Sequence, residues 1–255
     1  MKSKRPKVLG LIVLGLFLSL THMDRTAEAF LKPGNGEGEP RIIVVLVDMS
    51  GSTNLARRTI YKEGFEKIFQ DLGQGDRIMV GTITGRSYID FQPVVDVEIP
   101  RKSLWLNRIR FERNLTDTKE SVRTAVEDLF ARRKGTPRTE ILNSLNIADT
   151  IFHGDKRRHR ILVLFSDMIQ DSREHNFSRV EVTDAYVGKV IRYREKRDMI
   201  PNLANVKVYV AGASGADPNK FRSVERFWAR YFEKTGADFS PHRYGHSLIS
   251  FEGKL

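Results

Sequence analysis

Two short apolar runs constrain the fold of this chain more than any other feature. Residues 41–48 read RIIVVLVD and residues 160–167 read RILVLFSD, and neither run alternates between apolar and polar side chains. A strand that is apolar on both faces has to be covered on both faces, as a central strand of a parallel sheet is. Both runs end in an aspartate. We therefore expect two buried parallel strands with carboxylates at their carboxyl ends.

The rest of the chain alternates between strand-like and helix-like segments. Further strands are expected over residues 76–85 and 206–214, which are short apolar runs. Apolar residues at intervals of three and four predict amphipathic helices. These helices are expected over residues 54–73, 139–152, 183–197, and from Asp217 and Pro218 to Gly236. Strand and helix in turn predict an α/β fold, with an open, mostly parallel sheet and helices on both faces.

Residues 91–99, FQPVVDVEI, are expected to form an edge strand. Their side chains alternate between two faces, and Pro93 lacks the backbone N–H that a central strand needs. The short loop before this segment predicts that it runs antiparallel to its neighbour.

A further helix is expected to begin near residue 117. Asp117 and Glu120 have the spacing of a capping box, and an apolar stripe follows them. A brief, separate helical segment is expected before it, around residues 103–111.

The first 29 residues have the pattern of a secretory signal peptide. A basic opening, MKSKRPK, precedes an apolar run over residues 8–20, and AEA at 27–29 supplies small side chains for cleavage before Phe30. The alternative is an uncleaved N-terminal membrane anchor, although the run is short for the ~20 residues that span a bilayer. Either way the domain is expected outside the cytoplasm, periplasmic or extracellular.

A linker rich in glycine and proline is expected over residues 30–40, followed by one domain over residues 41–255. With 40% apolar residues, the chain can bury a core without covalent staples. It has no cysteine, which excludes disulfides and thiolate metal sites, so any metal has to be held by oxygen or histidine. The formal net charge is +11, and removal of residues 1–29, with five Lys/Arg and two Asp/Glu, leaves 11 − 3 = +8. This charge favours encounters with nucleic acid, anionic lipid or acidic protein surfaces without identifying one.

The two strand-end aspartates point to a cation site. Ligands of open parallel sheets bind at the carboxyl ends of the strands, where Asp48 and Asp167 would meet if their strands are neighbours. Two carboxylates that close repel each other unless a cation separates them. Ser50 and Ser52, on alternate positions after Asp48, add hydroxyl oxygens. Such oxygen ligands suit Mg²⁺, for which Mn²⁺ or Ca²⁺ could substitute.

These residues resemble a known family. The stretch DMSGS at 48–52 fits the DxSxS motif of the von Willebrand factor A domain, whose metal ion-dependent adhesion site also takes a threonine and a second aspartate from later loops. Thr139 in GTPRTEILNSL and Asp167 in LVLFSDM resemble these two residues, and the resemblance covers roughly residues 41–251.

The resemblance implies a role for each residue of the set. Ser50, Ser52 and Thr139 would ligate the ion, while Asp48 and Asp167 would hold it directly or through water. A remaining coordination position would accept a glutamate or aspartate of a partner protein, which implies an adhesion or scaffold module rather than an enzyme.

One departure from the family pattern leaves part of the site open. The family usually has glycine after the second aspartate, where this chain has Met168 followed by IQDS. Either Asp167 or Asp171 could therefore face the ion. Arg138 and Asp171 are expected to face the partner, Arg138 because the basic stretch RRKGTPR leads directly into Thr139.

Two other classes of function start from the same residues. A haloacid dehalogenase-like phosphatase would use a strand-end DxD, but Ser50 stands where its general acid is required. A protein that binds nucleic acid or another anionic polymer would use the basic clusters at 132–138, 156–160 and 192–197. Nucleic acid is not expected as a partner, because the protein is expected to be exported and no aromatic residues interleave with these clusters. Contact with a membrane is expected only through an uncleaved N-terminal segment.

Overall fold

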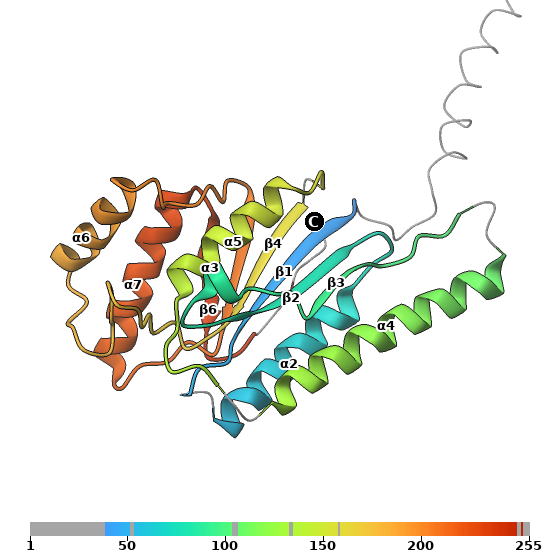
Figure 1. Cartoon of the computed structure of the whole chain (residues 1–255), viewed down its shortest axis with the longest axis horizontal. Helices are drawn as coiled ribbons and strands as arrows, with labels where there is room; N and C mark the ends of the chain where they lie inside the picture. The colour runs from blue at the N-terminus through green and yellow to red at the C-terminus, as the bar shows by residue number, and fades with distance from the viewer. Residues whose placement is uncertain are drawn as a thin grey trace, which may run out of the picture. The chain divides into compact units, whose positions relative to one another are not determined.

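The computed structural model describes residues 39–51, 54–103, 107–132, 135–157, 159–248 and 251 (Figure 1). The chain divides into two units, Met1–Glu37 and Gly38–Leu255, and every described residue belongs to the second. The predicted signal peptide, nearly all of the predicted linker, and Ser52 lie outside the described residues.

The described residues form a six-stranded sheet with the order β3-β2-β1-β4-β5-β6. All neighbouring strands are parallel except β3, which pairs antiparallel with β2 at one edge. This confirms the predicted fold class, an open, mostly parallel sheet with one antiparallel edge strand. The strands are β1 (Arg41–Asp48), β2 (Arg77–Ile83), β3 (Val95–Glu98), β4 (His159–Phe165), β5 (Val206–Ala211) and β6 (Asp238–Gly245).

Helices cover both faces of the sheet (Figure 1). One face of β1, which includes Val44, packs with buried residues of α5, α6 and α7, and the other face, which includes Val45, packs with α2 and α4. Both faces of β1 are therefore apolar, as its sequence predicts. The helices are α2 (Leu55–Asp71), α3 (Ser87–Asp90), α4 (Arg108–Ala131), α5 (Ile141–His153), α6 (Asp184–Glu195) and α7 (Pro218–Thr235).

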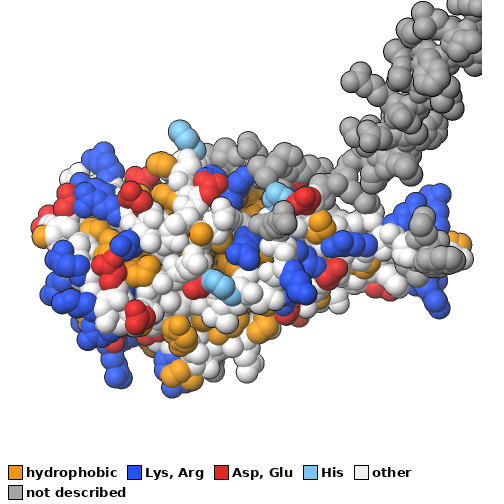
Figure 2. All heavy atoms as spheres, turned by 90° about the horizontal axis from the view of Figure 1, so that it is seen from above, with side chains coloured by type: hydrophobic (Ala, Val, Ile, Leu, Met, Phe, Trp, Pro, Cys, Tyr) orange, Lys and Arg blue, Asp and Glu red, His pale blue; other side chains and the backbone are white. Residues whose placement is uncertain are grey.

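The predicted start of a helix near residue 117 is wrong. Helix α4 begins at Arg108, and the side chain of Asn107 caps it by accepting a hydrogen bond from the N–H of Ile109 at 2.9 Å. Asp117 lies inside this helix, so the capping-box pattern does not mark an end. The first turns of α4 extend past the strands in Figure 1, and basic side chains gather at that end in Figure 2.

The strand β6 was not expected from the sequence. Its residues, DFSPHRYG, are mostly polar and only partly buried, and its hydrogen bonds to β5 place it in the sheet. The pattern of apolar residues therefore gives no signal for it.

Among the described residues, no helix is long and apolar enough to cross a membrane.

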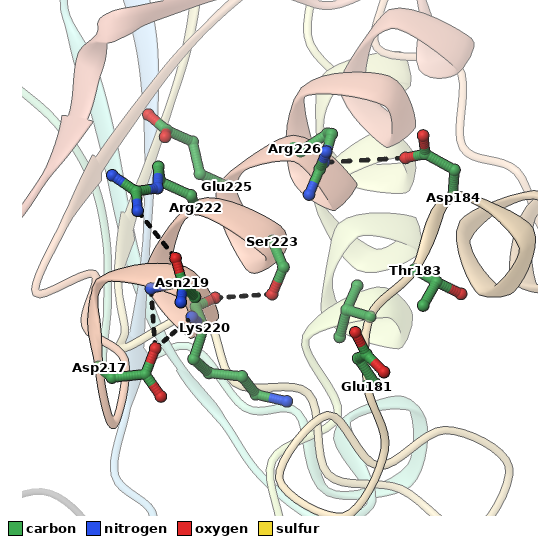
Figure 3. A pocket seen from close by; sticks show the side chains of 11 residues that line it. Glu181, Thr183, Asp184, Asp217, Asn219, Lys220, Arg222, Ser223, Glu225 and Arg226 are labelled. Carbon is green, nitrogen blue, oxygen red and sulfur yellow. Dashed lines mark hydrogen bonds and ion pairs between the residues drawn. The ribbon is translucent and has the colours of Figure 1, made fainter.

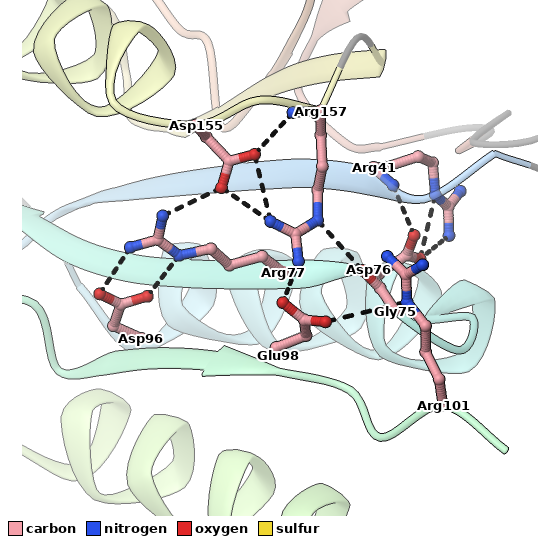
Figure 4. Close-up of polar contacts among 9 residues, drawn as sticks. All are labelled: Arg41, Gly75, Asp76, Arg77, Asp96, Glu98, Arg101, Asp155 and Arg157. Atoms are coloured by element: carbon pink, nitrogen blue, oxygen red, sulfur yellow. Dashed lines mark hydrogen bonds and ion pairs between the residues drawn. The ribbon is translucent and has the colours of Figure 1, made fainter. Parts of the chain in front are cut away.

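An ion-pair network ties together the amino ends of the central strands (Figure 4). Arg41, at the start of β1, binds Asp71 and Asp76, and Asp155 lies between Arg77 and Arg157. Burial alone would raise the pKa of Asp155, but hydrogen bonds from these two arginines lower it overall. The network is at the opposite edge of the sheet from Asp48, so it supports the fold and not the candidate site.

Candidate functional site

The strand order brings the two predicted carboxylates to one edge of the sheet. Strands β1 and β4 are neighbours with Val47 opposite Phe165, so Asp48 ends β1 beside the segment that carries Asp167. Asp48 is fully buried. Burial raises the pKa of Asp48 to about 6, with a further contribution from the charge of Asp167, which places the two carboxylates within electrostatic reach of each other.

Hydrogen bonds hold the carboxylate of Asp48 in place. Its Oδ1 accepts from the backbone N–H of Ser50 at 2.9 Å, and its Oδ2 accepts from the hydroxyl of Ser166, also at 2.9 Å. The side chain of Ser50 also hydrogen-bonds to it. These bonds favour the charged form and partly offset the effect of burial, so the site keeps an anion ready at neutral pH.

Backbone pairing joins the loop after β1 to the loop before α5. Gly51 donates to the carbonyl of Thr136 at 3.0 Å, and Thr136 donates to the carbonyl of Met49 at 3.1 Å. A Cβ at Gly135 would overlap the carbonyl oxygen of Met49, so this close approach requires glycine. The pairing brings Ser50 next to the segment that leads to Thr139.

A second backbone pairing adds the loop after β4. Thr139 and Asp171 exchange two hydrogen bonds, at 3.0 and 2.9 Å. The carboxylate of Asp171 accepts from the side-chain amide of Asn176 at 2.7 Å, whereas the charge of Asp167 acts on Asp48. Of the two aspartates left open by the sequence, Asp167 is therefore the one near Asp48.

Met168 occupies the position where the family pattern has glycine. Its φ of 65° lies in the left-handed region that favours glycine, and its side chain is fully buried. Its N–H donates to the hydroxyl of Ser166 at 3.0 Å, and its carbonyl accepts from Nε1 of Trp228 at 2.8 Å. Burial and these bonds hold the loop in the conformation that glycine would adopt more easily.

Arg57 belongs to the site although no motif or spacing in the sequence singles it out. Its Nη1 donates to Oδ2 of Asp167 at 2.9 Å, and its Nη2 donates to the hydroxyl of Ser214 at 3.0 Å. The side chains of Arg57 and Asp167 are 18% and 9% exposed. Asn54, the N-cap of α2, accepts from the N–H of Arg57 and so fixes the turn that carries it. An arginine in a polar helix turn looks like a solvent-exposed residue in sequence.

The donor set fits a hard divalent cation in its chemistry. It consists of two carboxylates and hydroxyl oxygens, the ligands that Mg²⁺ prefers. Thr139 is 5% exposed, and its hydroxyl makes no hydrogen bond to another described residue. The buried hydroxyl of Tyr61, whose pKa is raised by burial and then by Asp48, also has no such partner.

The same donor set is poor in charge. Among the residues that the structure describes, no group of three or more His, Cys, Asp or Glu side chains could hold a metal ion. Binding would thus depend on hydroxyls as much as on the two carboxylates. Ser52 is outside the described residues, so its role as a ligand stays a prediction.

In two of the basic clusters, one arginine is less exposed than the sequence suggests. Arg157 pairs with Asp155 and Glu98 in the network at the amino ends of the strands. Arg194 is buried, donating to the hydroxyl of Tyr231 at 2.8 Å. Arg138, by contrast, is exposed and lies directly before Thr139 at the edge that carries Asp48.

A large hollow of about 910 Å³ lies between the amino ends of α6 and α7 (Figure 3). None of the predicted site residues lines it. Asp217 and Thr183 cap the two helices there, and Lys220 donates to the carbonyls of Phe177 and Val180. These side chains therefore hold the two helix ends and the loop before α6.

No protein-family model matches the sequence, and no curated protein matches it. Among solved structures, the fold is similar to one described as "von Willebrand factor type A from Catenulispora acidiphila". The TM-score is 0.36 with 15% sequence identity, over 78% of this chain and 42% of that chain. This chain thus matches less than half of the length of that protein. The likeness concerns the fold alone, which the strand order and pairing define independently.

Proposed function

We propose that the chain is an exported interaction module that binds a glutamate or aspartate of a partner protein through a divalent cation. The observation that carries the proposal is the backbone pairing of three loops at the carboxyl edge of the sheet. Gly51 pairs with Thr136, and Thr139 pairs with Asp171. This pairing supports the proposal because it joins the loops that carry Ser50, Thr139 and Asp171 near the end of β1.

In this proposal Asp48, Ser50, Thr139 and Asp167 hold the ion, with Ser52 as a further ligand predicted from the sequence. The cation is Mg²⁺, with Mn²⁺ or Ca²⁺ as substitutes. When bound, it supplies a coordination position for a carboxylate, which stays electrophilic because several of the protein ligands are neutral hydroxyls.

The chain's own residues prepare the site. Ser166 and the N–H of Ser50 orient the carboxylate of Asp48, and burial keeps competing water away from it. Arg57 balances the charge of Asp167. We propose that this ion pair stabilises the loop in the absence of a metal ion and is exchanged for the ion on binding.

The proposed role is binding without catalysis. Ser50, two residues after Asp48, cannot act as the general acid of a phosphatase. Export is proposed from the N-terminal sequence alone. A screen of phosphatase substrates separates the enzymatic alternative, and pull-down from an envelope extract with Mg²⁺ or with chelator tests for the partner.

The direct test is titration with Mg²⁺ and Mn²⁺ followed by calorimetry. Thr139→Ala removes one hydroxyl from the site, and Thr150→Ala, at an exposed position on α5, is the matched control. We expect Thr139→Ala to weaken metal binding about tenfold while Thr150→Ala leaves it unchanged, since loss of one ligand or its support typically costs 10- to 100-fold in affinity. Equal affinities in both folded variants would count against the proposed site.

A further inference from the structure

The first two turns of α4 project beyond the amino edge of the sheet. Strand β3 ends at this edge, where Glu98 pairs with Arg77 at the start of β2, and α4 follows β3 in the chain. The 24 residues of α4 rise about 36 Å, whereas the 8 residues of β1 span about 26 Å. The helix is therefore longer than the strands, and its first turns extend past them (Figure 1).

The projecting end is basic. It consists of the described residues 99–103 and 107–116, called the α4 tip below, and basic side chains gather there in Figure 2. Glu112 is the one acidic residue among these described residues, so the charge of the α4 tip is 5 − 1 = +4. Its basic residues are all exposed: Arg101, Lys102, Arg108, Arg110 and Arg113.

Ion pairs account for only two of these cations. Arg108 pairs with Glu112 at 2.7 Å, and Arg101 pairs with Glu98 at 3.8 Å. Three cations of the α4 tip have no ion pair with another described residue: Lys102, Arg110 and Arg113.

The acidic residues on either side of the α4 tip do not cancel its charge. Glu98 precedes it and Asp117 follows it on α4. With both counted, the charge is still 5 − 3 = +2. The surface is therefore positive wherever its boundary is drawn, which favours an anionic partner.

Helix stability does not explain these charges. The backbone N–H groups at the start of a helix carry partial positive charge, so acidic side chains stabilise the first turn and basic ones oppose it. The first turn of α4 has no acidic residue and carries Arg108 and Arg110. Residues that oppose local stability are typical of functional surfaces.

An exposed apolar side chain lies among the cations. Ile109 is 70% exposed, and it is four residues before Arg113 on α4, so the two side chains share one face of the helix. Apolar and basic side chains at one helix surface are typical of binding to an anionic membrane, where the apolar group enters the acyl boundary and the arginines stay at the phosphates. Nucleic acid offers phosphates but no apolar layer for Ile109.

The chain also enters the domain at this edge. Strand β1 begins at Arg41, opposite His159 at the start of β4. The apolar run over residues 8–20 lies only 20 residues before β1 in the sequence. If this run is an uncleaved anchor, it attaches the domain by the edge that carries the α4 tip.

We propose that the α4 tip binds the surface of an anionic lipid bilayer, with Ile109 at the acyl boundary and Arg110 and Arg113 at lipid phosphates. The carboxyl edge of the sheet, with Asp48, then faces away from the membrane and towards a partner. The inference goes beyond the proposed function and does not depend on the metal ion.

The test uses the full chain, which has no cysteine, so that Ile109→Cys can carry a single environment-sensitive nitrobenzoxadiazole dye. The control label is on Leu55→Cys, an 83% exposed position in the first turn of α2, at the carboxyl edge. The labelled chains are mixed, in chelator, with vesicles of phosphatidylcholine alone or of equal parts phosphatidylcholine and phosphatidylglycerol. Emission wavelength and quenching by brominated acyl chains measure contact with lipid.

We expect a blue shift and quenching of the dye at residue 109 on the anionic vesicles, and no such change at residue 55. About 0.5 M salt should reverse the change, because salt screens exposed charges. In R110Q/R113Q the ratio of lipid-bound to free dye at residue 109 should fall about 25-fold, since each basic side chain near an anionic surface contributes about fivefold. The matched control is R173Q/R179Q, which removes two exposed arginines after β4 and should leave the ratio unchanged.

Three results would overturn the inference: equal responses of the two labels, an equal response on neutral vesicles, or a response that R110Q/R113Q retains. A dye at residue 109 that responds to duplex DNA and not to anionic vesicles would also overturn it, and would make the α4 tip a nucleic-acid surface. Because chelator is present throughout, none of these results bears on the proposed metal site. Thermal unfolding confirms that each variant is folded.

Discussion

Replacing Arg57 with glutamine is expected to raise the affinity of the site for divalent cations. The guanidinium donates to Oδ2 of Asp167 at 2.9 Å, and a metal ion that uses this carboxylate has to compete with it. Glutamine keeps much of the side-chain length and the ability to donate a hydrogen bond to Ser214, but removes the positive charge.

The size of the effect follows from the ion pair. Its side chains are only 18% and 9% exposed, so solvent screens the pair weakly. A hydrogen bond to a charged group contributes about 1.5–3 kcal/mol. If metal binding has to displace this contact, its loss should tighten binding about 10- to 100-fold, because about 1.4 kcal/mol corresponds to a factor of ten.

The assay is calorimetric titration of Arg57→Gln with Mg²⁺ and Mn²⁺. Arg58→Gln is the matched control, since Arg58 is the next residue of α2 and donates to the carbonyl of Phe130 at 3.2 Å. In chelator, Arg57→Gln should be less stable by about 1–3 kcal/mol, because Asp167 loses its charged partner. Equal or weaker metal affinity in Arg57→Gln would refute the competition and would make Arg57 a residue that positions Asp167.

Three further predictions concern the loops of the site. The pKa of Asp48 is raised to about 6 without metal. The metal-free domain should therefore lose stability as pH rises from about 4 to 6, because the protonated carboxyl is the form that burial favours. Mg²⁺ affinity should fall up to about tenfold per pH unit below about 6, because the proton competes with the ion. A calorimetric affinity that stays constant between about pH 5 and 7 would contradict this. Met168→Gly should destabilise the domain by about 1–3 kcal/mol in urea unfolding, since losing a buried methionine side chain outweighs relief of the left-handed φ; a stabilised variant would show that strain dominates. Gly135→Ala should separate the paired loops, and the free energy of Mn²⁺ binding should change more than the free energy of unfolding. Unchanged Mn²⁺ affinity would show that the pairing is not needed.

The sequence predicted the central strands because burial leaves a direct pattern. Residues of β1 pack on both faces of the sheet, and a run without polar interruption has no other stable place in a folded domain. The sequence predicts that Asp48 and Asp167 lie close together only on the condition that β1 and β4 are neighbours. Strand order itself leaves no periodic pattern in the chain.

The wrong start of α4, the missed strand β6 and the missed burial of Arg194 each have a physical reason. Asp117 and Glu120 have the spacing of a capping box inside a continuous helix, because the pattern also occurs where packing carries a helix through it. Strand β6 is held by hydrogen bonds to β5 and has no apolar run. A buried arginine such as Arg194 looks the same in sequence as an exposed one.

The parts of the site that the sequence missed depend on contacts between loops. Arg57 reaches Asp167 across 110 positions of the chain, and Gly51 reaches Thr136 through a backbone pairing. No spacing of residues along the sequence predicts either contact. Motif matching found residues that resemble a family's set, but not the charges that surround them.

The central claim is that one divalent cation binds between the ends of β1 and β4. A crystal structure of the domain grown with Mn²⁺, with anomalous data, tests this most directly. We predict one anomalous peak at ligand distances of about 2.0–2.6 Å from oxygens of Ser50 and Thr139, with Asp48 and Asp167 bound directly or through water. A map without a peak at this edge, with Arg57 still paired to Asp167 at saturating Mn²⁺, would contradict the account.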